Sequence, residues 1–195
     1  MTVTFWDRRW PPFALALILG GGTMLAGWLA GTSPAEQALL AARWTARAAL
    51  PLFLVTYIAS SLLRLWPGEI TRALVRRRRQ WGLGFALAHS IHLGALLYNI
   101  LNFDSRPLPT LLGGGLAYLL IYVMAATSND ASVRLLGKWW KRLHSFGIHY
   151  IWLIFALSYL GRFSDGDSDH FMTAVTLFPL MIAALALRLY ARFRR

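Results

Sequence analysis

Residues 81–101 read WGLGFALAHSIHLGALLYNIL, an apolar run long enough to cross a bilayer that nevertheless carries two histidines, His89 and His92. A second apolar run, residues 142–161, carries His144 and His149. An ionisable side chain at membrane depth is costly and needs a partner, so these four histidines are the first candidates for a functional site.

The composition indicates an integral membrane protein. Hydrophobic residues make up 57% of the 195-residue chain, which has nine tryptophans and a mean hydropathy of +0.49, more apolar material than one soluble core needs. Cysteine is absent, which excludes disulfides, thiolate haem ligation, iron–sulfur clusters and cysteine-based zinc sites. Histidine must therefore carry any metal chemistry.

Apolar segments of membrane-spanning length can be placed six times along the chain. They lie at about residues 11–30, 48–66, 81–101, 110–127, 142–161 and 171–190. Turn-forming residues separate them, and no small-residue cleavage site follows the first run, which we interpret as a retained helix. The sequence predicts an all-α integral membrane protein in which residues 1–195 form one transmembrane domain, a bundle of six helices.

The distribution of basic residues predicts the orientation. With the N-terminus inside, the inner side collects sixteen of the twenty Lys and Arg residues, and only Arg43, Arg47, Arg106 and Arg162 lie outside. This obeys the positive-inside rule, so both termini are expected to be cytoplasmic, in a multi-pass protein of a bacterial-type inner membrane. The net charge of +12 is attributed to contacts with membrane lipid headgroups and not to nucleic acid, because the basic residues flank apolar spans.

Depth and helical angle suggest how the histidines pair. Counted from Trp81 and Trp140 as interfacial anchors, His92 and His149 differ in depth by only about 3 Å. His89 and His92 share a broad helix face, whereas His144 and His149 lie about 140° apart and cannot both face one cofactor. One haem would therefore take one histidine from each helix.

The helix face that carries His92 has small residues at Gly84 and Ala88, which would let a flat macrocycle lie against the backbone. We therefore predict His92 and His149 as the axial pair, Gly84 and Ala88 as cofactor contacts, and His89 and His144 as the alternative ligands. Small residues at this spacing are also typical of helix–helix contacts. The rival reading is a haem-free small transporter or membrane assembly subunit, with structural or proton-relay histidines.

Two motifs resemble the ferric reductase-like transmembrane family. They are Arg78-Arg79-Gln80-Trp81-Gly82 with the following His92, and the run Leu136-Gly137-Lys138-Trp139-Trp140-Lys141-Arg142-Leu143-His144. The family includes the haem-binding subunit of the periplasmic methionine sulfoxide reductase system and the transmembrane domains of NADPH oxidases. The resemblance, over roughly residues 76–162, implies a six-helix bundle with b-type haem ligated from the third and fifth helices. Transferred residue by residue, it supports His92 and His144.

The chain departs from the family pattern at two positions. The second histidine of the fifth helix is replaced by Leu157, and the earlier histidine of the third helix is replaced by Arg78. One haem b is therefore expected rather than two.

The expected role is electron transfer. No phosphate-binding glycine loop or soluble stretch could hold a flavin or nicotinamide, so electrons must come from a separate flavin reductase or from quinol and leave to an unidentified acceptor. With two histidine ligands the iron has no open position and would only pass electrons. Residues 130–141, with capping residues at Ser128, Asn129 and Asp130, are expected to form a short interfacial helix that could dock the donor.

Overall fold

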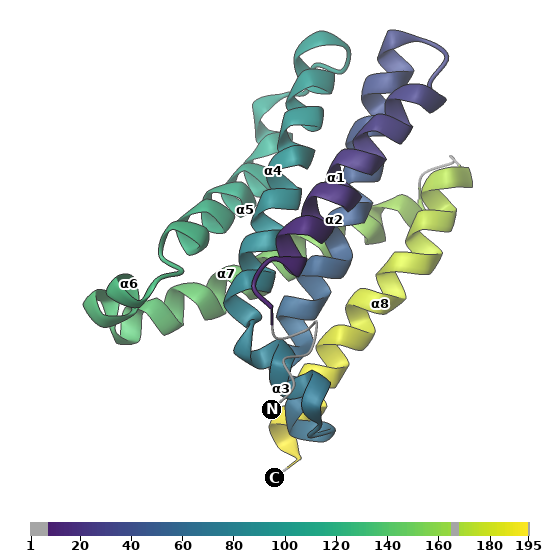
Figure 1. The fold of residues 1–195 in the computed structure, drawn as a ribbon. Coiled ribbons are helices and arrows are strands. Elements are labelled where there is room, and N and C mark those ends of the chain that lie inside the picture. The colour runs from purple at the N-terminus through teal and green to yellow at the C-terminus, as the bar shows by residue number, and fades with distance from the viewer. Residues whose placement is uncertain (1–7, 165–167, 195) are drawn as a thin grey trace. The chain divides into compact units, whose positions relative to one another are not determined.

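The computed structural model describes residues 8–164 and 168–194, and neither range contains a strand. The helices are α1 (Pro11–Ala30), α2 (Pro34–Leu65), α3 (Glu69–Arg76), α4 (Arg78–Asn102), α5 (Leu108–Ala126), α6 (Asp130–Leu136), α7 (Lys138–Leu160), the short 3-10 helix η2 (Gly161–Phe163) and α8 (Ser168–Phe193), as Figure 1 shows. The predicted all-α fold is confirmed.

Six helices are long and apolar enough to cross a membrane: α1, α2, α4, α5, α7 with its η2 extension, and α8. Large apolar side chains stand exposed along them, with Leu29 at 78% and Leu101 at 79% exposure. A folded chain leaves such side chains outward when the surrounding medium is lipid. The predicted six spans are confirmed, whereas cytoplasmic termini stay a prediction.

The second span begins much earlier than residue 48, where the sequence analysis placed its start. Ser33 caps α2 by accepting a hydrogen bond from the Glu36 amide at 3.3 Å, and Pro34 occupies the first helical position. The Glu36 carboxylate in turn accepts from the Thr32 amide at 2.8 Å. These caps start a helix regardless of hydropathy, so the alanine-rich stretch before residue 48 is helical although it carries two arginines.

The chain forms two compact units, one ending at Thr110 and one beginning at Leu111, and each is described by itself. In the first unit α1, α2 and α4 pack against one another, and α3 packs on α2 and α4. Helix α1 approaches α2 closely at Gly27, where a Cβ atom would lie 2.5 Å from the Ala41 amide nitrogen. Only a residue without a side chain fits there. That residues 1–195 form one domain stays a prediction.

In the second unit, α7 packs on α8 and η2, and it is also tied to α5. The Trp152 indole donates a hydrogen bond to the Met181 carbonyl of α8 at 2.9 Å, and the Tyr150 hydroxyl donates to the Gly113 carbonyl of α5 at 3.1 Å. Polar groups at the tips of otherwise apolar rings thus join neighbouring helices of this unit.

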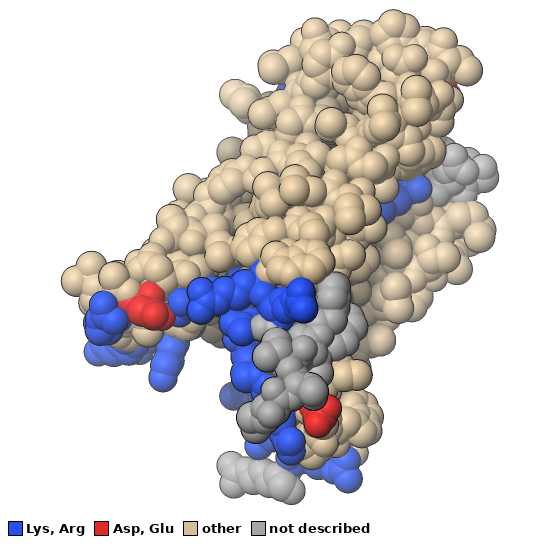
Figure 2. Space-filling model, in the orientation of Figure 1, with Lys and Arg blue, Asp and Glu red and all other residues tan. Residues whose placement is uncertain are grey.

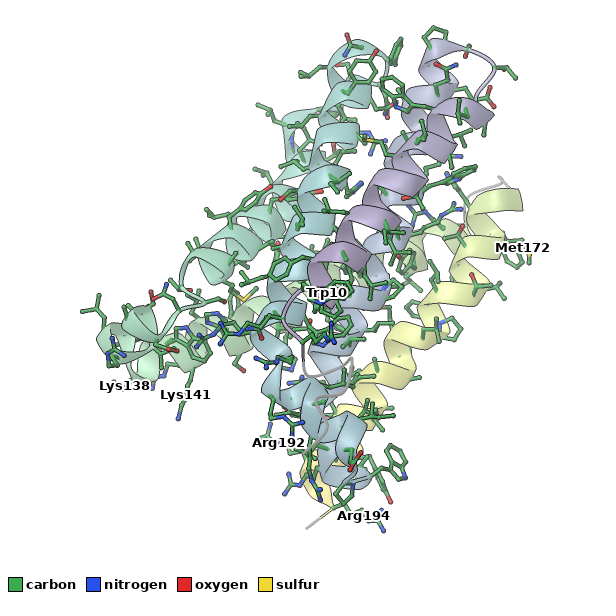
Figure 3. The ribbon with its side chains drawn as sticks, in the orientation of Figure 1. Trp10, Lys138, Lys141, Met172, Arg192 and Arg194 are labelled. Atoms are coloured by element: carbon green, nitrogen blue, oxygen red, sulfur yellow. The ribbon has the colours of Figure 1, made fainter. Side chains whose placement is uncertain are left out.

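The helix predicted at residues 130–141 is confirmed only for its first half, and its interfacial position stays a prediction. Asn129 caps α6 by accepting from the Ser132 amide at 2.8 Å, and the helix ends at Gly137, whose φ of 49° lies in the left-handed region. Lys138 and Lys141 therefore belong to α7 and project from its first turns (Figure 3). Lys and Arg gather on the surface at this junction (Figure 2).

Candidate functional site

His89 and His92 lie side by side on α4, as their spacing predicted. Their ring centroids are 5.1 Å apart, and the Phe85 ring stands 5.1 Å from His89 on the other side. His89 is only 9% exposed, whereas His92 is half-buried. The more accessible ring of the pair is therefore that of His92.

Thr45 of α2 hydrogen-bonds to His92. The Thr45 hydroxyl donates to the Ala41 carbonyl at 2.7 Å, and its oxygen lies 3.2 Å from Nδ1 of His92. A hydroxyl proton directed to Ala41 leaves the Thr45 oxygen able to accept a hydrogen bond from Nδ1–H of the imidazole. This tautomer makes Nε2 the unprotonated nitrogen, the form in which histidine coordinates a metal.

Gly84 of the predicted small-residue stripe has a contact within the first unit. A Cβ atom at Gly84 would lie 2.7 Å from the Pro12 carbonyl oxygen of α1, and Ala88 is fully buried. Close backbone approach at small residues is how membrane helices pack without large side chains. Cofactor contact at Gly84 and Ala88 stays a prediction. The close contact of Gly84 with α1 argues against contact between Gly84 and a cofactor.

His149 lies in the second unit with its Nδ1 2.6 Å from the Ser145 carbonyl oxygen, one helical turn earlier on α7. A carbonyl can only accept, so Nδ1 carries the proton and Nε2 is again the coordinating nitrogen. His149 lines a shallow depression of about 530 Å³ along α7. The other lining residues are Arg142, Ser145, Phe146, Tyr150 and Leu153.

His144 is engaged differently. Its ring stacks on Trp140 with centroids 4.0 Å apart, its Nδ1 lies 3.1 Å from the Trp140 carbonyl, and its Nε2 lies 3.2 Å from the Met124 carbonyl of α5. The Trp140 indole also donates to the Thr127 carbonyl at 2.8 Å. Both nitrogens of His144 thus contact main chain of the second unit, and coordination by Nε2 would require the contact with Met124 to break.

The comparisons with known proteins decide the family. Over 133 residues the chain is 33% identical to the protein-methionine-sulfoxide reductase haem-binding subunit MsrQ of Cronobacter sakazakii, covering 59% of this chain and 64% of that protein. Over 150 residues it is 31% identical to the protein of the same name in Pectobacterium carotovorum, covering 68% of this chain and 71% of that relative. The chain belongs to the MsrQ family. The MsrQ of Pectobacterium atrosepticum matches to the same extent.

No family model matches the chain, and neither does any solved structure. The matched region is just under two thirds of the Cronobacter sakazakii MsrQ. Membership of the MsrQ family confirms the resemblance that the sequence analysis drew from the motifs ending at His92 and His144.

Among residues 8–164 and 168–194, no group of three or more His, Cys, Asp or Glu side chains is arranged to hold a metal ion. The ligand set predicted for this MsrQ family member is smaller, two histidines on α4 and α7. Each of these histidines is described within its own unit, and their pairing stays a prediction.

The sequence analysis missed two residues that hold the candidate site of this MsrQ family member. Thr45 was not singled out, because nothing in the linear sequence relates it to a histidine 47 positions away. Arg78 was given no structural contact, although it begins a motif that resembles the family and also marks a departure from the family pattern. Its guanidinium donates to the Thr56 carbonyl and to the Ser60 hydroxyl of α2, both at 3.1 Å, and so ties the start of α4 to α2.

Proposed function

We propose that this chain is a membrane electron-transfer protein that binds one b-type haem through Nε2 of His92 and Nε2 of His149, as the haem-binding subunit of a protein-methionine-sulfoxide reductase. Two observations support the proposal together. The relatives are named haem-binding MsrQ subunits. Both histidines hydrogen-bond through Nδ1, which leaves Nε2 as the coordinating atom.

The ligand chemistry of these residues fits a haem with two imidazole ligands. Such a haem would supply one-electron oxidation and reduction at its iron. The Thr45 hydroxyl fixes the ring of His92, and the Ser145 carbonyl fixes the ring of His149, so neither ligand depends on the cofactor for its orientation. The buried His89 ring lies beside His92 and packs in turn on the buried Phe85 ring, so one side of the proposed ligand is lined by buried rings.

The electrons come from outside the chain and leave it to another protein. The acceptor we propose is a catalytic subunit of the methionine sulfoxide reductase, and the donor is a flavin reductase or quinol. Both termini are proposed to face the cytoplasm, in an inner membrane of bacterial type. The cluster of cations where α6 meets α7 then faces a cytoplasmic donor.

A visible spectrum of the detergent-purified protein tests the proposal. We expect a red preparation whose absorption changes reversibly between oxidised and reduced forms typical of six-coordinate haem. A haem-free transporter or assembly subunit would instead be colourless when purified from haem-replete cells and would not bind added haemin. That result would reject the proposal.

A further inference from the structure

We infer that Arg142 binds a propionate carboxylate of the haem that His149 ligates, which gives this chain a site for the cofactor's charged edge. The inference rests on the proposed function and extends it to the orientation of the cofactor along α7.

The spacing along α7 brings Arg142 and His149 to the same face. Seven residues make almost two helical turns, so the two side chains differ by about 20° around the axis and about 10 Å along it. A haem bound through its iron to His149 would lie with its face toward α7, and its propionates would reach a comparable distance along the helix. The long side chain of Arg142 and the propionate together span the distance along α7 between Arg142 and the iron bound to His149.

The depression along α7 has the chemistry that such a cofactor requires. Arg142 and His149 both line it, and Phe146, Tyr150 and Leu153 provide its apolar walls. Flat cofactors bind in concave, mostly apolar sites with a few polar groups that set their orientation. Here Nε2 of His149 and the guanidinium of Arg142 lie on one face of α7, separated along the helix axis.

Arginine suits this position better than a lysine would. Its guanidinium presents a planar fork of donors that matches a carboxylate. The Arg142 guanidinium lies 4.7 Å from the centroid of the Trp139 ring, a cation–π contact that limits its motion. Lys141 is the adjacent cation but does not line the depression. It is therefore a matched control.

The test uses the full-length protein stripped of haem and titrated with haemin or with haemin dimethyl ester, in which both propionates are neutral. The wild type should bind haemin roughly tenfold more tightly than the ester, the effect of losing one charge-assisted hydrogen bond. Arg142→Gln should weaken haemin binding to the level of the ester and leave the ester's affinity unchanged. Arg142→Lys should recover part of the preference, and Lys141→Gln should behave as the wild type.

A second measurement follows the reduction potential of the haem. Loss of the Arg142 charge leaves a propionate anion uncompensated, which favours the ferric form and lowers the midpoint potential of Arg142→Gln relative to Lys141→Gln. Equal preference for haemin over its ester in the wild type and in Arg142→Gln would overturn the inference while leaving the proposed function intact. A wild type that binds neither compound would overturn the proposed function and the inference together.

Discussion

The hydroxyl oxygen of Thr45 lies 3.2 Å from Nδ1 of His92 and joins α2 to α4 at the predicted ligand. The contact orients the imidazole and favours the tautomer in which Nδ1 carries the proton, the form in which a histidine can coordinate a metal through Nε2.

Thr45→Val should weaken haem binding by about ten- to a hundredfold, the usual effect of removing the partner of a ligating histidine. Valine keeps the shape of threonine, so packing of α2 on α4 is preserved. Haemin titration of the apoprotein measures the change. Thr56→Val is the control, because the Thr56 hydroxyl bonds only to the Leu52 carbonyl of its own helix among the bonds described. Equal affinities in the two variants would contradict the role of Thr45.

His92→Ala should abolish haem retention, because it removes a proposed axial ligand. His89→Ala removes the neighbouring ring, 5.1 Å away, and should retain most of the haem. The ratio of haem to protein after purification distinguishes them. If His89→Ala is colourless and His92→Ala keeps a six-coordinate spectrum, the two roles on α4 are reversed.

Substitution of the two histidines of α7 is expected to have different effects. His149→Ala should lose the haem, whereas His144→Ala should keep it but unfold at a lower temperature. The reason is that His144 contacts the Trp140 and Met124 carbonyls, and loss of such polar contacts costs about 1–3 kcal/mol. Spectra and thermal unfolding curves of both variants measure this. Loss of all haem from His144→Ala, with an unchanged spectrum for His149→Ala, would show that the family's ligand position holds here.

Gly27→Ala should destabilise the first unit by about 1–3 kcal/mol, because the added methyl group would meet backbone atoms of α2. Gly21→Ala is a matched control on the same helix, since a Cβ atom there would have no neighbour within 4 Å. Thermal unfolding in detergent compares the two. Identical melting temperatures would mean that α1 and α2 can separate without loss of stability.

Charge reversal at both Lys138 and Lys141 should slow reduction of the haem by an acidic flavin reductase, without loss of haem. Added salt should slow reduction of the wild type similarly, because exposed charges are screened over roughly 8–10 Å at physiological ionic strength. Stopped-flow absorbance measures the rate, with Arg106→Glu, in the loop before α5, as the control. If the reduction rate is unaffected by charge reversal and by salt but increases with added quinol, quinol is favoured as the donor.

The class of fold and the candidate residues follow from local features of the amino-acid sequence. Apolar runs of bilayer length, helical periodicity and the two histidine pairs are local properties of the chain, so six spans and the positions of His89, His92, His144 and His149 were predictable from it. The start of α2 was misjudged because hydropathy marks the membrane and not the helix, and the helix begins at its cap beside Ser33.

The contacts of each candidate side chain depend on how the helices pack. The bond from His92 to Thr45, the contact of Gly84 with Pro12 and the engagement of His144 with Met124 all join separate helices. Such contacts depend on how each helix is rotated and placed against its neighbours within a unit. Helix packing sets that rotation through the summed fit of many small surfaces, and no single spacing in the sequence encodes it.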